Sequence, residues 1–118
     1  MSEAWPTELR VKDSGAELFV SFDDGSSYTL SAELLRVESP SAEVKGHGPG
    51  QETLVFGKRN IKIIKVEPVG SYAVRLIFSD MHSTGLYTWN YLAKLGLDEK
   101  SIWRAYEAKL QSERKSRD

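Results

Sequence analysis

The sequence has no cysteine among its 118 residues. This absence excludes a disulfide scaffold, a thiolate zinc site, a cysteine-ligated iron–sulfur cluster and a cysteine nucleophile. Long apolar runs are also missing, because no stretch exceeds four consecutive apolar residues and a spanning helix needs about twenty. Residues 1–10 have neither the basic start nor the apolar segment of a signal peptide. We therefore expect a cytoplasmic protein that does not bind membranes.

An excess of charge of either sign is likewise absent. Sixteen basic and seventeen acidic residues give a net charge of −1, so the chain has no general attraction for nucleic acid. No nucleic-acid-binding motif is present either, and we expect no such partner. Hydrophobic residues make up 40% of the chain, which is enough for a core at this length. The composition predicts one folded domain over residues 1–118.

Alternating apolar and polar residues predict antiparallel hairpins in both halves of the chain. Strands are expected at 9–12, 18–22, 28–30, 61–69, 72–78 and 84–88. Within the expected strand 61–69, the adjacent residues Ile63 and Ile64 indicate either a strand covered on both faces or a β-bulge. Short helical segments are expected at 31–37 and at 89–95, where Gly96 would end the helix. The pattern predicts an α+β fold with small antiparallel hairpins or sheets, short helices and a C-terminal helix.

The C-terminal segment, residues 97–118, is predicted to be that helix followed by a charged tail. Asp98 precedes the helix, and one face of the helix is apolar, formed by Ile102, Trp103, Tyr106 and Leu110. Residues 113–118 are almost all charged, and we expect them to fray.

Residues 38–50 differ in character from the rest of the chain. They contain two prolines, three glycines and His47, which is a composition typical of loops. Thirteen residues is long for a connection without secondary structure, and such loops often carry function. The segment is either a functional loop or a surface excursion.

Catalytic motifs are not found. The chain has no Gly-x-Ser-x-Gly elbow and no His-x-Asp or His-x-Glu pair, so neither a serine hydrolase nor a non-heme iron oxygenase is indicated. The two histidines, His47 and His82, would form a metal site only together with carboxylates such as Glu38, Glu43 or Asp80. We expect no enzyme activity.

Aromatic residues gather near the C-terminus. Trp89, Tyr91, Trp103 and Tyr106 either pack a helix pair onto the sheets or form a partly exposed patch for a partner. His47, Trp89, Tyr91 and Trp103 are accordingly the candidate interaction surface, for an unidentified protein or for a second copy in a homodimer.

Three segments resemble a known family. They are residues 34–44, residues 46–48 and residues 78–92, and the last contains the pattern Asp-x-His-x-x-Gly-x-Tyr-x-Trp-x-Tyr-Leu from Asp80 to Leu92. Together they are similar to the gamma-butyrobetaine hydroxylase-like N-terminal domain, also called the domain of unknown function 971. The resemblance extends over about residues 6–96.

The resemblance implies an accessory module. In this family the domain occurs alone in small bacterial proteins, and it also precedes the 2-oxoglutarate-dependent dioxygenases of carnitine synthesis. A related copy follows the P-loop ATPase of some iron–sulfur scaffold proteins. The sequence contains no dioxygenase domain, so the resemblance implies a non-catalytic interaction module with a link to iron–sulfur or metal metabolism. The alternative is a metal- or small-ligand-binding domain that uses His82 and the 38–50 loop.

The resemblance also bears on zinc. In the carnitine enzymes this domain holds zinc with three cysteines and one histidine. The cysteine positions fall on Ser39, Ser41 and Val44, and the histidine position falls on His82. Serine is a poor zinc ligand and valine is none, so we expect the zinc site to be lost and no cofactor to be bound. We further expect His82 to pack against residues 38–44, with a ring nitrogen bonded to a carbonyl, a hydroxyl or a carboxylate.

Overall fold

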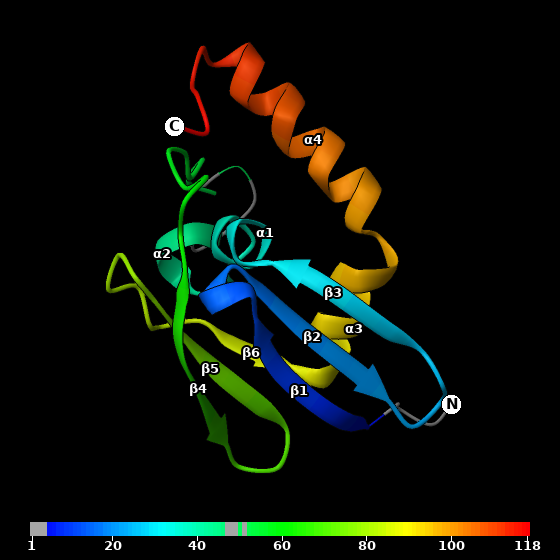
Figure 1. The fold of residues 1–118 in the computed structure, drawn as a ribbon. Coiled ribbons are helices and arrows are strands. Elements are labelled where there is room, and N and C mark those ends of the chain that lie inside the picture. Colours follow the sequence, from blue (N-terminus) through cyan, green and yellow to red (C-terminus); the bar gives the residue numbers. More distant parts are fainter. Residues whose placement is uncertain (1–4, 47–49, 51) are drawn as a thin grey trace.

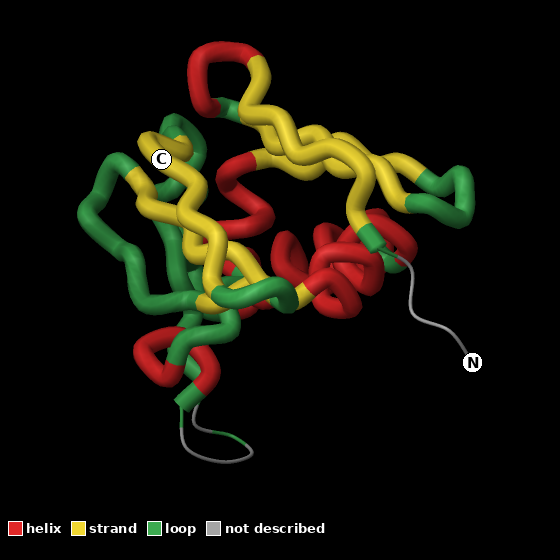
Figure 2. Tube along the Cα trace, turned by 90° about the horizontal axis from the view of Figure 1, so that it is seen from below, coloured by secondary structure: helices red, strands yellow, loops and turns green. Residues whose placement is uncertain are grey.

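The computed structural model describes residues 5–46, 50 and 52–118, which form two three-stranded antiparallel sheets and several helices (Figures 1 and 2). The first sheet contains, in spatial order, β1 (Pro6–Lys12), β2 (Glu17–Phe22) and β3 (Ser27–Ser31). The second contains β4 (Ile63–Val69), β5 (Ala73–Phe78) and β6 (Leu86–Thr88). The helical elements are the short 3₁₀ turn η1 (Asp13–Gly15), α1 (Ala32–Val37), α2 (Ala42–Lys45), α3 (Trp89–Leu97) and α4 (Glu99–Ser112). The α+β class expected from the sequence is confirmed.

The two sheets are built on the same local plan. In each sheet the last residue of the last strand carries a hydroxyl that caps the helix that follows. Ser31 Oγ accepts from the backbone N–H of Leu34 at 3.0 Å, and Thr88 Oγ1 accepts from that of Tyr91 at 3.2 Å. These bonds satisfy N–H groups that a helix start leaves unpaired. The hydroxyls therefore fix where α1 and α3 leave their sheets.

The core lies between the two sheets and takes side chains from both. The strands present alternate residues inward, as the period of two requires. Their buried members, joined by those of α1 and α3, are Leu18, Val20, Phe22, Leu30, Leu34, Leu35, Ile63, Val74, Leu76, Phe78, Tyr87, Leu92 and Leu95. A smaller cluster of Val37, Tyr106 and Leu110 attaches α4 to the end of α1. None of the helices in the described residues is long and apolar enough to cross a membrane.

Three local predictions are corrected or resolved. The 38–50 segment is not a loop throughout, because residues 42–45 form α2; His47 lies outside the described residues. A β-bulge does occur between Ile63 and Lys65, and it leaves the Ile64 side chain 65% exposed. Gly96 does not end α3 but lies within it.

Gly96 serves close packing rather than helix termination. A Cβ built at this position would lie 2.2 Å from Cγ of Tyr28, whose ring comes from β3. Only glycine lets α3 approach the first sheet this closely, because real Cβ contacts are never so short.

The C-terminal tail is ordered and does not fray. It turns back after α4 at Arg114, whose φ is 55°, and runs beside residues 57–59. The backbone N–H groups of Gly57 and Arg59 donate to the carbonyls of Ser116 and Arg117, both at 2.9 Å. The expectation of fraying was wrong because these partners are more than fifty residues away in the sequence.

We predict that Gly96→Ala lowers the free energy of unfolding by about 1–3 kcal/mol, because the added methyl group clashes with the Tyr28 ring. Helix propensity alone would give the opposite sign, a gain of about 0.5–1 kcal/mol. Chemical denaturation measures the difference. Lys94→Ala, at an exposed position of α3, is the control and should change stability by less than about 0.5 kcal/mol.

Candidate functional site

His82 lies in the turn between β5 and β6, and the turn fixes its position. Its carbonyl accepts from the N–H of Phe78 at 3.0 Å, and its own N–H donates to Asp80 Oδ1 at 3.1 Å. Met81 adopts a left-handed φ of 72°, and its side chain is 83% exposed. The turn therefore directs Met81 outward and His82 inward.

The His82 ring is bonded through both nitrogens to the segment that leads from α1 into α2. Nε2 lies 2.8 Å from Ser39 Oγ and 3.4 Å from Ser41 Oγ, and Nδ1 lies 3.3 Å from Glu43 Oε2. We call Ser39, Ser41, Glu43 and His82 the polar centre. The prediction that His82 packs against residues 38–44 is confirmed.

The polar centre is closed to solvent. Ser39 is 0% exposed, Ser41 5% and His82 6%. Gly85 lies directly over Ser39, since an added Cβ at Gly85 would be 2.3 Å from the Ser39 hydroxyl oxygen. Only Glu43 reaches the surface, and its other carboxylate oxygen accepts from Thr84 Oγ1 at 3.1 Å.

A charged group next to the polar centre holds the same two segments together. Asp80 Oδ2 accepts from Arg36 Nε at 2.8 Å and from Lys58 Nζ at 2.7 Å. Burial raises the pKa of Asp80, but the bonds from Lys58 and Arg36 outweigh it and lower the pKa to about 2. Asp80 is therefore ionised throughout the physiological range.

His82 is held in its neutral form. Burial lowers its pKa below the ordinary value, and the nearby Arg36 charge lowers it further, against the opposing effect of Glu43. A neutral imidazole has one donor and one acceptor nitrogen, and a serine hydroxyl can complement either. The ring and the hydroxyls thus form a neutral network in an enclosed place.

Two aromatic hydroxyls extend the contact between these segments. Tyr87 donates to the carbonyl of Leu35 and Tyr91 donates to that of Glu38. Burial raises the pKa of both phenols, so they remain donors. Two carbonyls at the end of α1, those of Leu35 and Glu38, are therefore satisfied by β6 and α3.

The chemistry open to the polar centre is narrow. The arrangement resembles a catalytic triad, with Ser39 in the position of the nucleophile, His82 in that of the base and Glu43 in that of the orienting carboxylate. The hydroxyl of Ser39 is fully covered, however, so a substrate carbonyl has no path to it in this structure. As for metals, the described residues contain no group of three or more His, Cys, Asp or Glu side chains placed to hold an ion. The Arg36 charge beside His82 also opposes a bound cation.

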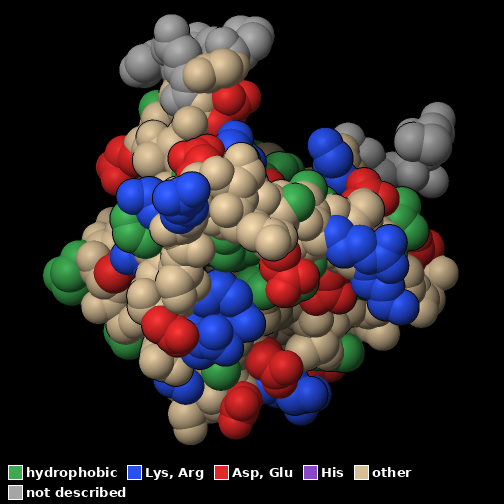
Figure 3. All heavy atoms as spheres, turned by 90° about the horizontal axis from the view of Figure 1, so that it is seen from above, with side chains coloured by type: hydrophobic (Ala, Val, Ile, Leu, Met, Phe, Trp, Pro, Cys, Tyr) green, Lys and Arg blue, Asp and Glu red, His purple; other side chains and the backbone are tan. Residues whose placement is uncertain are grey.

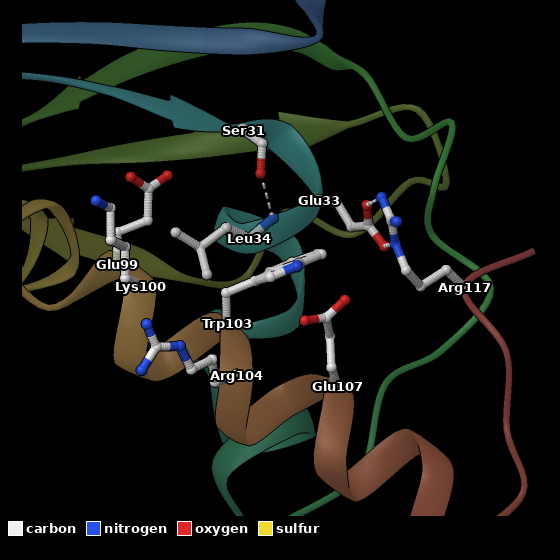
Figure 4. Close-up of a pocket in the computed structure, with 9 residues that line it drawn as sticks. All are labelled: Ser31, Glu33, Leu34, Glu99, Lys100, Trp103, Arg104, Glu107 and Arg117. Carbon is white, nitrogen blue, oxygen red and sulfur yellow. Dashed lines mark hydrogen bonds and ion pairs between the residues drawn. The ribbon is translucent and has the colours of Figure 1, made fainter.

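The remaining candidate residues do not form one patch with the polar centre. Val44 is buried beside it, 4% exposed. Trp89 and Tyr91 are partly buried, and their polar side-chain atoms donate to the backbone carbonyls of Ser71, at 2.9 Å, and Glu38. Trp103 is partly buried and lies on α4, beside Leu34 and Arg117 (Figure 4).

Sequence reasoning missed a buried ion pair beside Trp103. Glu33, 5% exposed, accepts a two-pronged bond from Arg117, with distances of 2.7 and 2.9 Å. The Arg117 guanidinium also lies 5.1 Å from the centre of the Trp103 ring. The available signal was Glu33 itself, an acidic residue inside a short apolar helical segment.

We predict that His82→Ala lowers the free energy of unfolding by about 1–3 kcal/mol without abolishing folding, because the buried Ser39 hydroxyl loses its partner. Denaturant titration measures the loss. Met81→Ala removes an exposed side chain from the same turn and should change stability by less than about 0.5 kcal/mol. Equal effects of the two substitutions on stability would contradict a stabilising role of the bond between His82 and Ser39.

We also predict that stability falls below pH 6.5. Because the pKa of His82 is lower in the folded chain than its ordinary 6.5, the unfolded chain binds the proton first. The stabilisation is complete above pH 6.5 and is lost as the pH falls toward the folded pKa. Unfolding free energies at about pH 7.5 and 5.5 should differ more for the wild type than for His82→Ala. The same difference in both proteins would show that a group other than His82 causes the loss of stability at low pH.

Comparison with known proteins gives consistent results. The family profile described as gamma-butyrobetaine hydroxylase-like, N-terminal, matches residues 9–93. Among curated proteins, none matches the chain. One solution NMR structure is 42% identical, with a TM-score of 0.85, and the match covers 99% of this chain and 92% of that one. A second is 46% identical, with a TM-score of 0.84 and coverage of 98% and 86%.

A crystal structure at 1.93 Å provides a third relative, a protein of unknown function from Acidithiobacillus ferrooxidans ATCC 23270 that belongs to the domain of unknown function 971 family. It is 40% identical, with a TM-score of 0.64, over 77% of this chain and 91% of that one. The resemblance seen in the sequence is confirmed: the chain belongs to the gamma-butyrobetaine hydroxylase-like N-terminal domain family, the domain of unknown function 971.

Proposed function

We propose that this chain is a stand-alone, non-catalytic interaction module that binds a protein partner in the cytoplasm. The observation that carries the proposal is the complete burial of Ser39 within the polar centre. A hydroxyl that no substrate reaches, bonded to a neutral histidine, supports a structural role for the constellation that most resembles an active site. The function is then to be sought on the surface.

The surface feature that best fits a partner is a groove between α1 and α4, here called the α1–α4 groove. It encloses about 550 Å³ and is lined by Glu33 and Leu34 from α1, by Lys100, Trp103 and Arg104 from α4, and by Arg117 (Figure 4). Tryptophan and arginine are the residues most enriched at interaction hot spots. The face that bears α4 carries charges of both signs interspersed, so it favours a polar, specific contact (Figure 3).

The family resemblance supports one class of partner. Domains similar to this one accompany iron–sulfur scaffold proteins, and this supports a partner from iron–sulfur or metal metabolism. The argument is one of association with a fold and is separate from the groove itself.

We predict that affinity capture from the native cell extract recovers one identified protein, and that reversing the charges of the groove abolishes its recovery. The variant is Lys100→Glu/Arg104→Glu, at two exposed residues of α4. The control is Arg10→Glu/Lys12→Glu, which reverses two exposed charges on β1 and should retain the partner. Loss of the captured protein with both variants, or with neither variant, would contradict binding through the groove.

A second candidate function, binding of a metal or small ligand at His82 and the 38–50 segment, is favoured by one observation. The hydroxyls of Ser39 and Ser41 converge on one ring nitrogen, as ligands of an ion would. The two functions differ in whether the purified chain retains a metal.

We predict that the dialysed wild-type chain holds far less than one zinc per molecule, because hydroxyl groups bind zinc poorly and Val44 does not bind it. The variant Ser39→Cys/Ser41→Cys/Val44→Cys should retain about one zinc, since thiolates at these positions join His82. Elemental analysis of both proteins is the measurement. About one zinc in the wild type would favour the second candidate function.

A further inference from the structure

The C-terminal tail packs on residues 56–59 in the way that a bound peptide would, and its Arg117 side chain reaches one end of the α1–α4 groove. Residues 115–118 run as an extended segment along residues 56–59, bonded through the carbonyls of Ser116 and Arg117. Lys115 Nζ lies 4.8 Å from the centre of the Phe56 ring, and Asp118 pairs with Arg59. Backbone bonds joined to a few side-chain anchors are the usual mode of recognition of an extended peptide.

One side chain of the tail provides most of the specific contact. Arg117 is half-buried, whereas the other residues from 113 to 118 are exposed. Its guanidinium places two N–H groups on the carboxylate of Glu33 and packs against Trp103. The negative charges of Glu33 and Glu107 hold its pKa above the ordinary value. Lysine offers neither the planar fork nor the stacking surface, so the site is specific for arginine.

The groove needs a cation at this position. The Glu33 side chain is 6% exposed, and a buried carboxylate without a partner is strongly destabilising. Its partner, however, lies 84 residues away in the sequence, on a segment whose other side chains face solvent. Beyond Arg117 the groove stays open along Trp103 and Lys100, with the tail in place (Figure 4). A longer segment from another protein would find both the arginine site and this unused length.

We propose that the α1–α4 groove recognises an extended peptide segment of a partner through one arginine, and that the chain's own Arg117 occupies this site until the partner displaces it. The inference rests on the proposed function, because it names the chemistry by which the module reads its partner. The tail then sets a minimum affinity that a partner segment must exceed in order to bind. It competes at an effective concentration of about a millimolar, so only a segment that also fills the open part of the groove displaces it.

The test uses full-length chains and a synthetic peptide with the sequence of residues 113–118, acetylated at its N-terminus. Arg117→Gln frees the site in the full chain, and calorimetry measures binding of the peptide. We expect this variant to bind the peptide at least about tenfold more tightly than the wild type, whose site is occupied. Replacing the second arginine of the peptide by lysine should weaken binding to the variant by at least about tenfold. Arg10→Gln, on β1, is the control and should bind as weakly as the wild type.

The denaturation midpoint of Arg117→Gln shows whether this variant folds. If it shows no cooperative unfolding, Arg117→Lys, which keeps a cation beside Glu33, replaces it. Equal binding to wild type and variant, or binding to neither, would overturn the inference. Exchange of tails between two copies would give a mass that rises with concentration, and would overturn the assignment to a partner in favour of a homodimer. The proposed function survives a failed peptide test if charge reversal in the groove still abolishes capture of the partner.

Discussion

The hydrogen bond between Ser39 and His82 is the interaction on which the middle of this structure depends. It joins the end of α1 to the turn between β5 and β6, two segments 43 residues apart. The bond is short, 2.8 Å, and is buried completely, so neither group has water as an alternative partner. The bonds of Asp80 with Arg36 and of Tyr87 with the Leu35 carbonyl tie the same two segments together. Since α1 follows the first sheet and the turn belongs to the second, these bonds also orient the sheets.

This arrangement accounts for how the chain keeps the fold of its family with no cysteine. The family resemblance places thiolate ligands at Ser39 and Ser41, and the structure shows both hydroxyls directed at the same ring nitrogen of His82. A neutral histidine suits hydroxyl partners, because it donates through one nitrogen and accepts through the other. Burial and the Arg36 charge keep the ring neutral. A network of hydrogen bonds therefore links the two segments in this chain.

The sequence predicted the parts of the fold that depend on local pattern. Alternation in residues such as Leu18, Val20 and Phe22 predicted the strands. The site of His82 was predicted through the family pattern from Asp80 to Leu92. Features that depend on distant contacts were missed. Gly96 has the look of a helix end, and only the Tyr28 ring explains its place inside α3. The tail is charged like a frayed end, and its position is explained by bonds to Glu33, Gly57 and Arg59, all distant in the sequence.

The central claim is that Ser39 and His82 stabilise the fold as a pair, and a double-mutant cycle tests it most directly. Unfolding free energies of the wild type, Ser39→Ala, His82→Ala and the double variant, measured at about pH 7.5, give the coupling energy. The account predicts a coupling of about 1 kcal/mol or more, because removing either partner leaves the other buried with only a longer contact, at 3.4 Å, to the Ser41 hydroxyl. Additive effects, with a coupling indistinguishable from zero, would contradict it.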